Sequence, residues 1–139
     1  MVDKEQENPY VLIEQVENAK SRQELESLTG ALVNLGELAV DALLEKMPKL
    51  VTARLNIIGA RVFARVGYPA NSKALDFMVS DVSNVNSSTC EISLDALLKI
   101  GKPALPVIDG ALDFYRRQDR EGYILEIDSL EDLKKQINE

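Results

Sequence analysis

The 139-residue chain has no histidine and only one cysteine, Cys90. Histidine is the commonest general base, a frequent zinc ligand and the side chain that titrates near neutral pH. A lone cysteine forms no disulfide within the chain and no cluster of several thiolates around a metal. These two shortages disfavour histidine-dependent catalysis, a structural zinc site and a histidine pH switch.

Long apolar runs and a basic N-terminus are also missing. No run approaches the roughly 18–20 residues that a membrane-spanning helix needs. Residues 1–8, MVDKEQEN, are polar and acidic, unlike a secretory signal peptide. We therefore expect a cytoplasmic protein with no membrane partner and a flexible N-terminus over residues 1–8.

Positive charge is scarce relative to negative charge. The net charge is −7, which repels the phosphate backbone of nucleic acids. The hydrophobic fraction of 45% is ordinary for a globular protein, so the chain has enough apolar residues for a core. The length suits one domain, and we expect residues 1–139 to form it.

What the sequence does contain is a repeated pattern of an apolar helix, a glycine stop and a second apolar helix. The stop glycines are Gly36, Gly67 and Gly101, at intervals of 31 and 34 residues. The first and third copies agree best, since Leu32 aligns with Leu97. One helix pair cannot bury its own apolar face, whereas stacked pairs share a continuous core. The pattern therefore predicts an all-α array of about three helical hairpins.

Local signals place the helix ends. Asn8 before Pro9 predicts the start of an N-terminal capping helix over residues 9–20. Ser21 with Glu24 forms a capping-box pattern for the helix that ends at Gly36. Thr52 is the expected cap of a later helix, and Ser72 that of the helix after Gly67. The hairpin repeats are expected over residues 21–118.

Prolines and serines give further boundaries. Pro48 is expected to stop the helix after Gly36, because an interior proline loses a hydrogen bond and clashes with the preceding turn. Pro103 should start the helix after Gly101. Residues 119–139 are expected to form a C-terminal cap with a last short helix starting at Ser129. Within it, residues 123–127 fit either a short strand or a helical turn.

The junction Ile100-Gly101-Lys102-Pro103-Ala104-Leu105-Pro106 resembles that of the HEAT-like repeat family, in particular the short bacterial type also called phycobilisome-lyase-like repeats. The resemblance covers roughly residues 21–118 and implies a right-handed α–α superhelix, a HEAT-like solenoid with capping helices. Family repeats often carry a Val-Arg pair, which is replaced here by Leu55-Asn56 and Thr89-Cys90. The repeats are therefore divergent, or the chain is another helical array with the same junction.

The resemblance implies a protein–protein interaction or scaffolding module without enzymatic activity or a cofactor. Its partner would bind the concave face, which the second helix of each pair lines. The alternative is an enzyme or enzyme subunit similar to phycobilin lyases, acting on a tetrapyrrole. A third reading, a helical-repeat nucleic-acid binder, is disfavoured by the acidic net charge.

The candidate chemical groups favour binding over catalysis. Cys90 would need a helix N-terminus or a nearby cationic side chain to become a reactive thiolate, and we expect a structural thiol instead. The chain's carboxylate pairs, such as Asp41 and Glu45, are typical of solvated helix faces. Phe114 either anchors a partner or packs under residues 123–127.

Each residue of an α-helix is rotated by 100° from the one before it. On the second helix of each pair, this rotation identifies the residues that point away from the buried stripe and toward a partner. This face would attract a basic segment of another protein, with an aromatic side chain as an apolar anchor. The predicted partner-binding residues are Asp41, Glu45, Asp76, Phe77, Ser80, Asp113 and Arg117.

Overall fold

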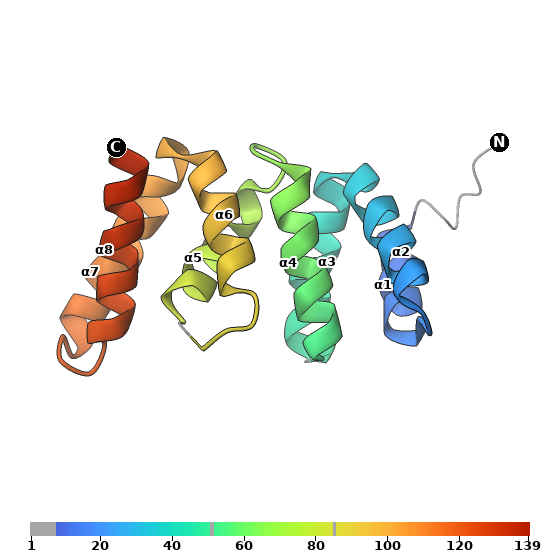
Figure 1. The fold of residues 1–139 in the computed structure, drawn as a ribbon, viewed down its shortest axis with the longest axis horizontal. Coiled ribbons are helices and arrows are strands. Elements are labelled where there is room, and N and C mark those ends of the chain that lie inside the picture. The colour runs from blue at the N-terminus through green and yellow to red at the C-terminus, as the bar shows by residue number, and fades with distance from the viewer. Residues whose placement is uncertain (1–7, 51, 85) are drawn as a thin grey trace. The chain divides into compact units, whose positions relative to one another are not determined.

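The computed structural model describes residues 8–50, 52–84 and 86–139, and within these residues it has helices and no strand (Figure 1). The expected flexibility of residues 1–8 falls almost wholly outside the described part of the chain. The all-α prediction is confirmed. The helices are α1 (Pro9–Asn18), α2 (Arg22–Leu35), α3 (Glu37–Leu50), α4 (Ala53–Val66), η2 (Ser72–Ala74), α5 (Leu75–Ser83), α6 (Cys90–Ile100), η3 (Lys102–Ala104), α7 (Leu105–Gln118) and α8 (Ile124–Asn138).

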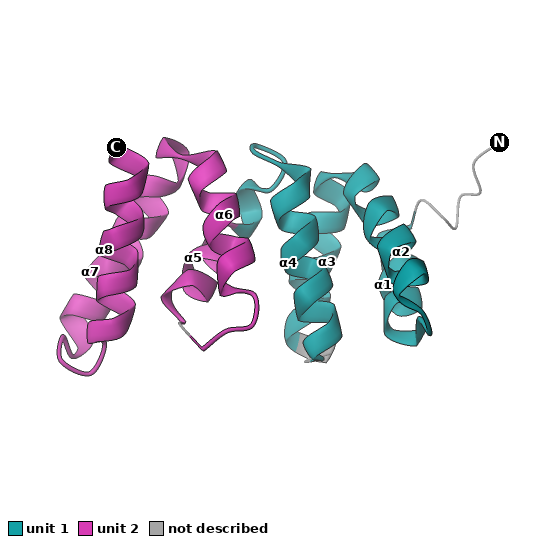
Figure 2. Ribbon diagram, viewed as in Figure 1, with its two compact units in different colours: residues 1–74 teal, residues 75–139 magenta. Residues whose placement is uncertain are grey.

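The helices gather into two compact units (Figure 2). Unit 1 is Met1–Ala74, with α1 to α4 and η2, and unit 2 is Leu75–Glu139, with α5 to α8 and η3. The expectation of a single domain over residues 1–139 stays a prediction.

The core of unit 1 lies where α2, α3 and α4 meet, with α1 packed against all three. Leu32, Leu43 and Phe63, one from each of these helices, have no measurable exposure. The close approach of α3 and α4 depends on Gly59, because a Cβ there would lie 2.5 Å from Sδ of Met47. The small residue thus makes room for a long core side chain from the neighbouring helix.

The core of unit 2 forms around α5 and α6, with α8 packed on α5, α6 and α7. Leu97 on α6, Ile108 on α7 and Leu130 on α8 are fully buried. Each burial of this kind stabilises the fold by about 1.5–3 kcal/mol. Unit 2 therefore has its own apolar centre, built by the same 3–4 spacing that the sequence shows.

Three predicted helix caps are confirmed. Asn8 Oδ1 accepts from the Tyr10 amide at 2.9 Å, and Thr52 Oγ1 accepts from the Leu55 amide at 3.2 Å. Ser21 Oγ accepts from the Glu24 amide at 3.1 Å. The other half of the capping box differs, because Glu24 accepts from the amide of Lys20 at 3.1 Å.

The three glycine stops are confirmed as well. Gly36, Gly67 and Gly101 have φ values of 60°, 82° and 72°, a region that favours glycine. The first and third copies also agree in burial, since residues 32–39 and 97–104 alternate between buried, half-buried and exposed in the same order. Each unit therefore contains one copy of the same helix–glycine–helix pattern in the same register.

The predicted stop at Pro48 is wrong, because Pro48 lies inside α3, which continues to Leu50. Pro48 is exposed and sits in the last turn of the helix. The proline still costs α3 one hydrogen bond and crowds the carbonyl four residues earlier, and the helix ends only two residues after it, at Leu50.

At two predicted α-helix starts the structure has a single 3₁₀ turn instead. Ser72 begins η2 and Pro103 lies within η3, while the α-helices begin at Leu75 and Leu105. The predicted start at Ser129 is also wrong, since α8 begins at Ile124 and includes it. The Ile127 amide donates to the Tyr123 carbonyl at 2.9 Å, so the helical alternative for residues 123–127 is correct.

Candidate functional site

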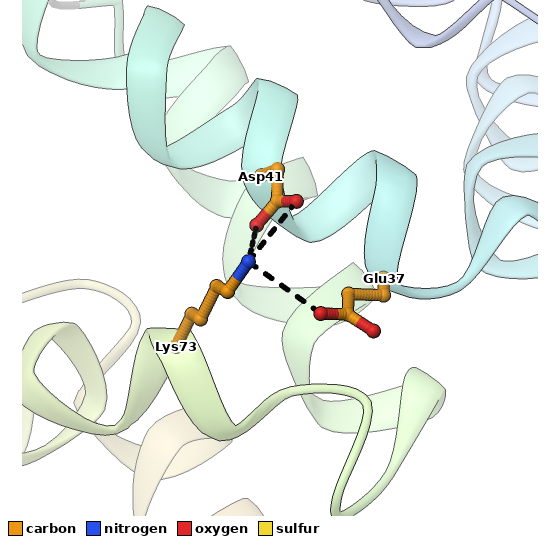
Figure 3. A network of polar contacts seen from close by, with 3 residues as sticks. All are labelled: Glu37, Asp41 and Lys73. Atoms are coloured by element: carbon orange, nitrogen blue, oxygen red, sulfur yellow. Dashed lines mark hydrogen bonds and ion pairs between the residues drawn. The ribbon is translucent and has the colours of Figure 1, made fainter.

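The predicted acidic residues of unit 1, Asp41 and Glu45, lie on α3 and are exposed, but both have partners within the unit. Lys73 of η2 places Nζ 3.2 Å from Asp41 Oδ1 and 3.5 Å from Glu37 Oε1 (Figure 3). The hydrogen bond to Asp41 and its charge raise the pKa of Lys73. One cation thus neutralises part of this acidic face.

Glu45 is held by Tyr10 of α1. The Tyr10 hydroxyl donates to Glu45 Oε2 at 2.6 Å, and this bond raises the pKa of Tyr10. Lys46 lies 5.6 Å from the centre of the Tyr10 ring, within cation–π range. Both predicted carboxylates of unit 1, Asp41 and Glu45, are therefore engaged with residues of the same unit.

Unit 2 contains a groove between α5 and α7 that includes two predicted residues, Asp76 and Ser80. Its volume is about 330 Å³. We call it the α5–α7 groove, and its lining residues are Asp76, Val79, Ser80, Pro106, Val107, Gly110, Ala111, Phe114 and Tyr115.

The two helices of the groove run in the same direction. Asp76 and Pro106 belong to the first turns of α5 and α7, and near the other end Ser83 Oγ lies 3.1 Å from the Tyr115 hydroxyl oxygen. Along α7 the groove extends from Pro106 to Tyr115, which at 1.5 Å per residue is about 13 Å. It therefore has a carboxylate at one end and aromatic rings at the other.

Gly110 and Ala111 of α7 are the smallest residues of the lining and leave room in the groove. A Cβ added at Gly110 would have no neighbouring heavy atom within 4 Å. Phe114 forms the wall, with 56% of its surface exposed and its ring edge-on to Tyr115 at 5.6 Å. Phe114 is thus not packed beneath residues 123–127.

The other predicted residues lie apart from the groove lining. Asp113 and Arg117 are exposed on α7, where Asp113 Oδ2 and Arg117 Nη2 form an ion pair at 2.9 Å. Phe77 is half-buried on α5 instead of fully exposed. The predicted partner-binding residues did not include Pro106 and Gly110, nor Phe114, which the sequence left open between a partner anchor and internal packing.

A signal for two of these residues was present in the repeat. Moving Asp41 and Glu45 forward by the 65 residues that separate Gly36 from Gly101 leads to Pro106 and Gly110. Helical angles on this helix instead selected the charged residues Asp113 and Arg117, which lie farther along it, so Pro106 and Gly110 were not chosen.

Cys90 lines a second pocket of about 390 Å³ that residues of α6 and α8 border. Its Sγ donates to the Val82 carbonyl at 3.6 Å. Partial burial, followed by the charges of Asp81 and Glu91, raises the pKa of the thiol. The protonated thiol is thereby favoured, which is the opposite of what an activated nucleophile requires.

Metal ligands and membrane spans were sought throughout the described residues. These residues contain no group of three or more cysteine, aspartate or glutamate side chains placed to hold a metal ion. No single described helix is long and apolar enough to cross a membrane, although α2 and Glu37–Pro48 pass that test together as a pair bent by 118°.

No protein-family model, curated protein or solved structure matches the chain.

Proposed function

We propose that this chain is a non-enzymatic, cytoplasmic protein-binding module in which the helix pairs stack as a HEAT-like array. Its partner binds along the second helices of the pairs. Two features support the proposal: the same glycine junction recurs at Gly36, Gly67 and Gly101, and the burial order around the first and third of them is the same.

The α5–α7 groove is the single observation that carries the binding function. Its lining combines apolar contact surface from Pro106, Val107 and Phe114 with one exposed carboxylate, Asp76. Asp76 makes no ion pair with any residue that the structure describes. A segment with apolar side chains and a lysine or arginine at one end matches this arrangement.

The length of the groove suits a helical segment. A docked helix presents anchors at i, i+3 or i+4, and i+7, and seven residues rise about 10 Å. The roughly 13 Å between Pro106 and Tyr115 accommodates these anchors. The net charge of −7 attracts a basic segment over longer range and speeds its encounter with the groove.

Filling the groove at Gly110 tests the proposal. The intact protein, Gly110→Ala and Gly110→Phe are each immobilised and exposed to an extract of the native host, and retained proteins are identified by mass spectrometry. Alanine adds one methyl group where no atom lies within 4 Å, whereas phenylalanine fills the groove. We expect the intact protein and Gly110→Ala to retain a partner that Gly110→Phe does not retain.

Retention of the same proteins by correctly folded Gly110→Phe would contradict binding in the groove. Far-ultraviolet circular dichroism of all three proteins checks their folding before the comparison.

A further inference from the structure

The α5–α7 groove of unit 2 has a counterpart in unit 1, between α1 and α3. A pocket of about 340 Å³ lies there, lined by Tyr10, Ile13, Glu14, Glu17 and Lys46. Each of the two sites lies beside the second helix of a glycine junction, because α3 follows Gly36 and α7 follows Gly101. The two sites therefore hold the same place in the repeat.

Burial matches the helices of the two sites residue by residue. Residues 10–14 of α1 and 76–80 of α5 lie 66 positions apart, and both runs are exposed, half-buried, buried, buried and exposed in that order. Residues 45–47 of α3 and 110–112 of α7 lie 65 positions apart, and both runs are exposed, half-buried and buried in that order. The helices that border the two sites therefore agree in register.

In unit 1 an aromatic side chain of the chain itself crosses the site. The Tyr10 hydroxyl donates to Glu45 Oε2 at 2.6 Å, and the centre of the Tyr10 ring lies 5.6 Å from Lys46 Nζ. Glu45 and Lys46 correspond to Gly110 and Ala111, the two smallest residues of the α5–α7 groove lining. A tyrosine ring thus reaches, in unit 1, the two positions that leave room in unit 2.

Unit 2 has a shorter side chain at the position of Tyr10. Asp76 stands there and lines the groove. A Cβ added at Gly110 would have no heavy atom within 4 Å, and the exposed ring of Phe114 borders this space. The space that the tyrosine ring takes in unit 1 is therefore open among the described residues of unit 2.

We propose that the partner's anchor in the α5–α7 groove is an aromatic side chain, which lies over Gly110 and Ala111 and beside Phe114. This inference rests on the proposed partner binding and names the class of residue that carries it. Two rings that meet edge-to-face or offset gain affinity beyond that of the buried area. A leucine side chain gains only the burial. The anchor is therefore a tyrosine, tryptophan or phenylalanine.

Two small probes test this choice without the partner. Amide NMR follows the intact chain during titration with N-acetyltyrosinamide and, separately, with N-acetylleucinamide. The tyrosine probe should shift residues 76–80 and 106–115 and bind about threefold or more tightly than the leucine probe. Tyr10 and Glu45 should shift little, because the Tyr10 side chain already crosses the unit 1 site.

A double variant copies the unit 1 arrangement into unit 2. Asp76→Tyr/Gly110→Glu carries the residues found at positions 10 and 45, and its own tyrosine should abolish the shifts caused by the tyrosine probe. The matched control Asp95→Tyr adds the same ring on the exposed side of α6, outside the groove lining, and should bind the probe like the intact chain. Circular dichroism checks the fold of both variants.

Three results would overturn the aromatic anchor: no shifts at the groove, equal affinity for the two probes, or undiminished binding of the tyrosine probe by the folded double variant. If Gly110→Phe still loses its partner in that case, the proposed function stands with an anchor of another class. A partner retained by folded Gly110→Phe would overturn the proposed function and the aromatic anchor together.

Discussion

Two glycines with equal space around them show how backbone conformation decides the effect of a single residue. Neither Gly30 nor Gly36 has a heavy atom within 4 Å of an added Cβ. Gly30 lies inside α2, whereas Gly36 has φ 60° and ψ −126°, a region used almost only by glycine. The space around an added Cβ is therefore the same at both glycines, and the backbone angles differ.

Alanine at these two positions should have opposite effects on the free energy of unfolding. Gly30→Ala should raise it by up to about 1 kcal/mol, because alanine is the better helix former. Gly36→Ala should lower it by about 1–3 kcal/mol, because alanine is strained at that φ and ψ. Urea unfolding of both variants provides the measurement, and a loss of stability at Gly30 would show that α2 does not tolerate the added methyl group.

Asp76 and Asp41 are both exposed aspartates on second helices, but their surroundings differ. Asp41 is paired with Lys73 at 3.2 Å, whereas Asp76 lines the α5–α7 groove and has no ion pair in the described residues. The groove therefore depends on Asp76 for its negative charge. Asp41→Lys serves as a matched control for reversal of one charge in the chain.

Asp76→Lys should lower the affinity for a basic partner about tenfold at low salt, with a smaller effect at high salt. Asp41→Lys should change partner affinity much less and leave stability nearly unchanged, as is usual when an exposed ion pair is lost. Titration calorimetry with the captured partner measures both. Equal weakening by the two variants would assign the effect to overall charge instead of the groove.

The connection between α5 and α6 depends on one carboxylate. Asp81 of α5 accepts from Thr89 Oγ1 at 2.7 Å and from Ser93 Oγ at 2.6 Å, and Ser87 Oγ donates to its other oxygen. Thr89 and Ser93 are only 3% and 1% exposed. The carboxylate thus satisfies hydroxyl groups that water does not reach, and it fixes the start of α6.

Asp81→Ala should lower the free energy of unfolding by about 2–3 kcal/mol, because it leaves buried hydroxyl groups without an acceptor. Asp95→Ala on the exposed side of α6 is the control and should change stability by no more than about 0.5 kcal/mol. Urea unfolding compares them. A change at Asp81 as small as the change at Asp95 would mean that the hydroxyl groups find other partners.

At the scale of elements, the sequence correctly predicted helix caps, which depend on residues close together in the chain. The caps at Asn8, Ser21 and Thr52 need only residues within one turn, and all three are present. The error at Ser129 comes from packing, which a local signal does not contain, whereas the predicted end at Pro48 is wrong by two residues, since α3 ends at Leu50. The core contacts of Ile127 and Leu130 extend α8 back to Ile124, and Pro48 is tolerated near the end of α3.

At the scale of the whole molecule, the three glycine stops were readable from the sequence and the site was only partly so. Helical angles correctly placed Asp76 and Ser80 on an exposed face, but they do not say which helix lies beside it. The pairing of Asp41 with Lys73 joins residues 32 apart in sequence, which periodicity does not reveal. The HEAT-like stacking and its protein partner stay proposals.

The central claim is that a partner protein occupies the α5–α7 groove, and amide NMR of the 15.4-kDa chain during titration with the captured partner tests it most directly. Chemical-shift changes should concentrate at residues 76–80 and 106–114, while Tyr10 and Glu45 in unit 1 change little. Gly110→Phe should abolish these changes. Shifts concentrated outside residues 76–80 and 106–114, or undiminished in Gly110→Phe, would contradict the claim.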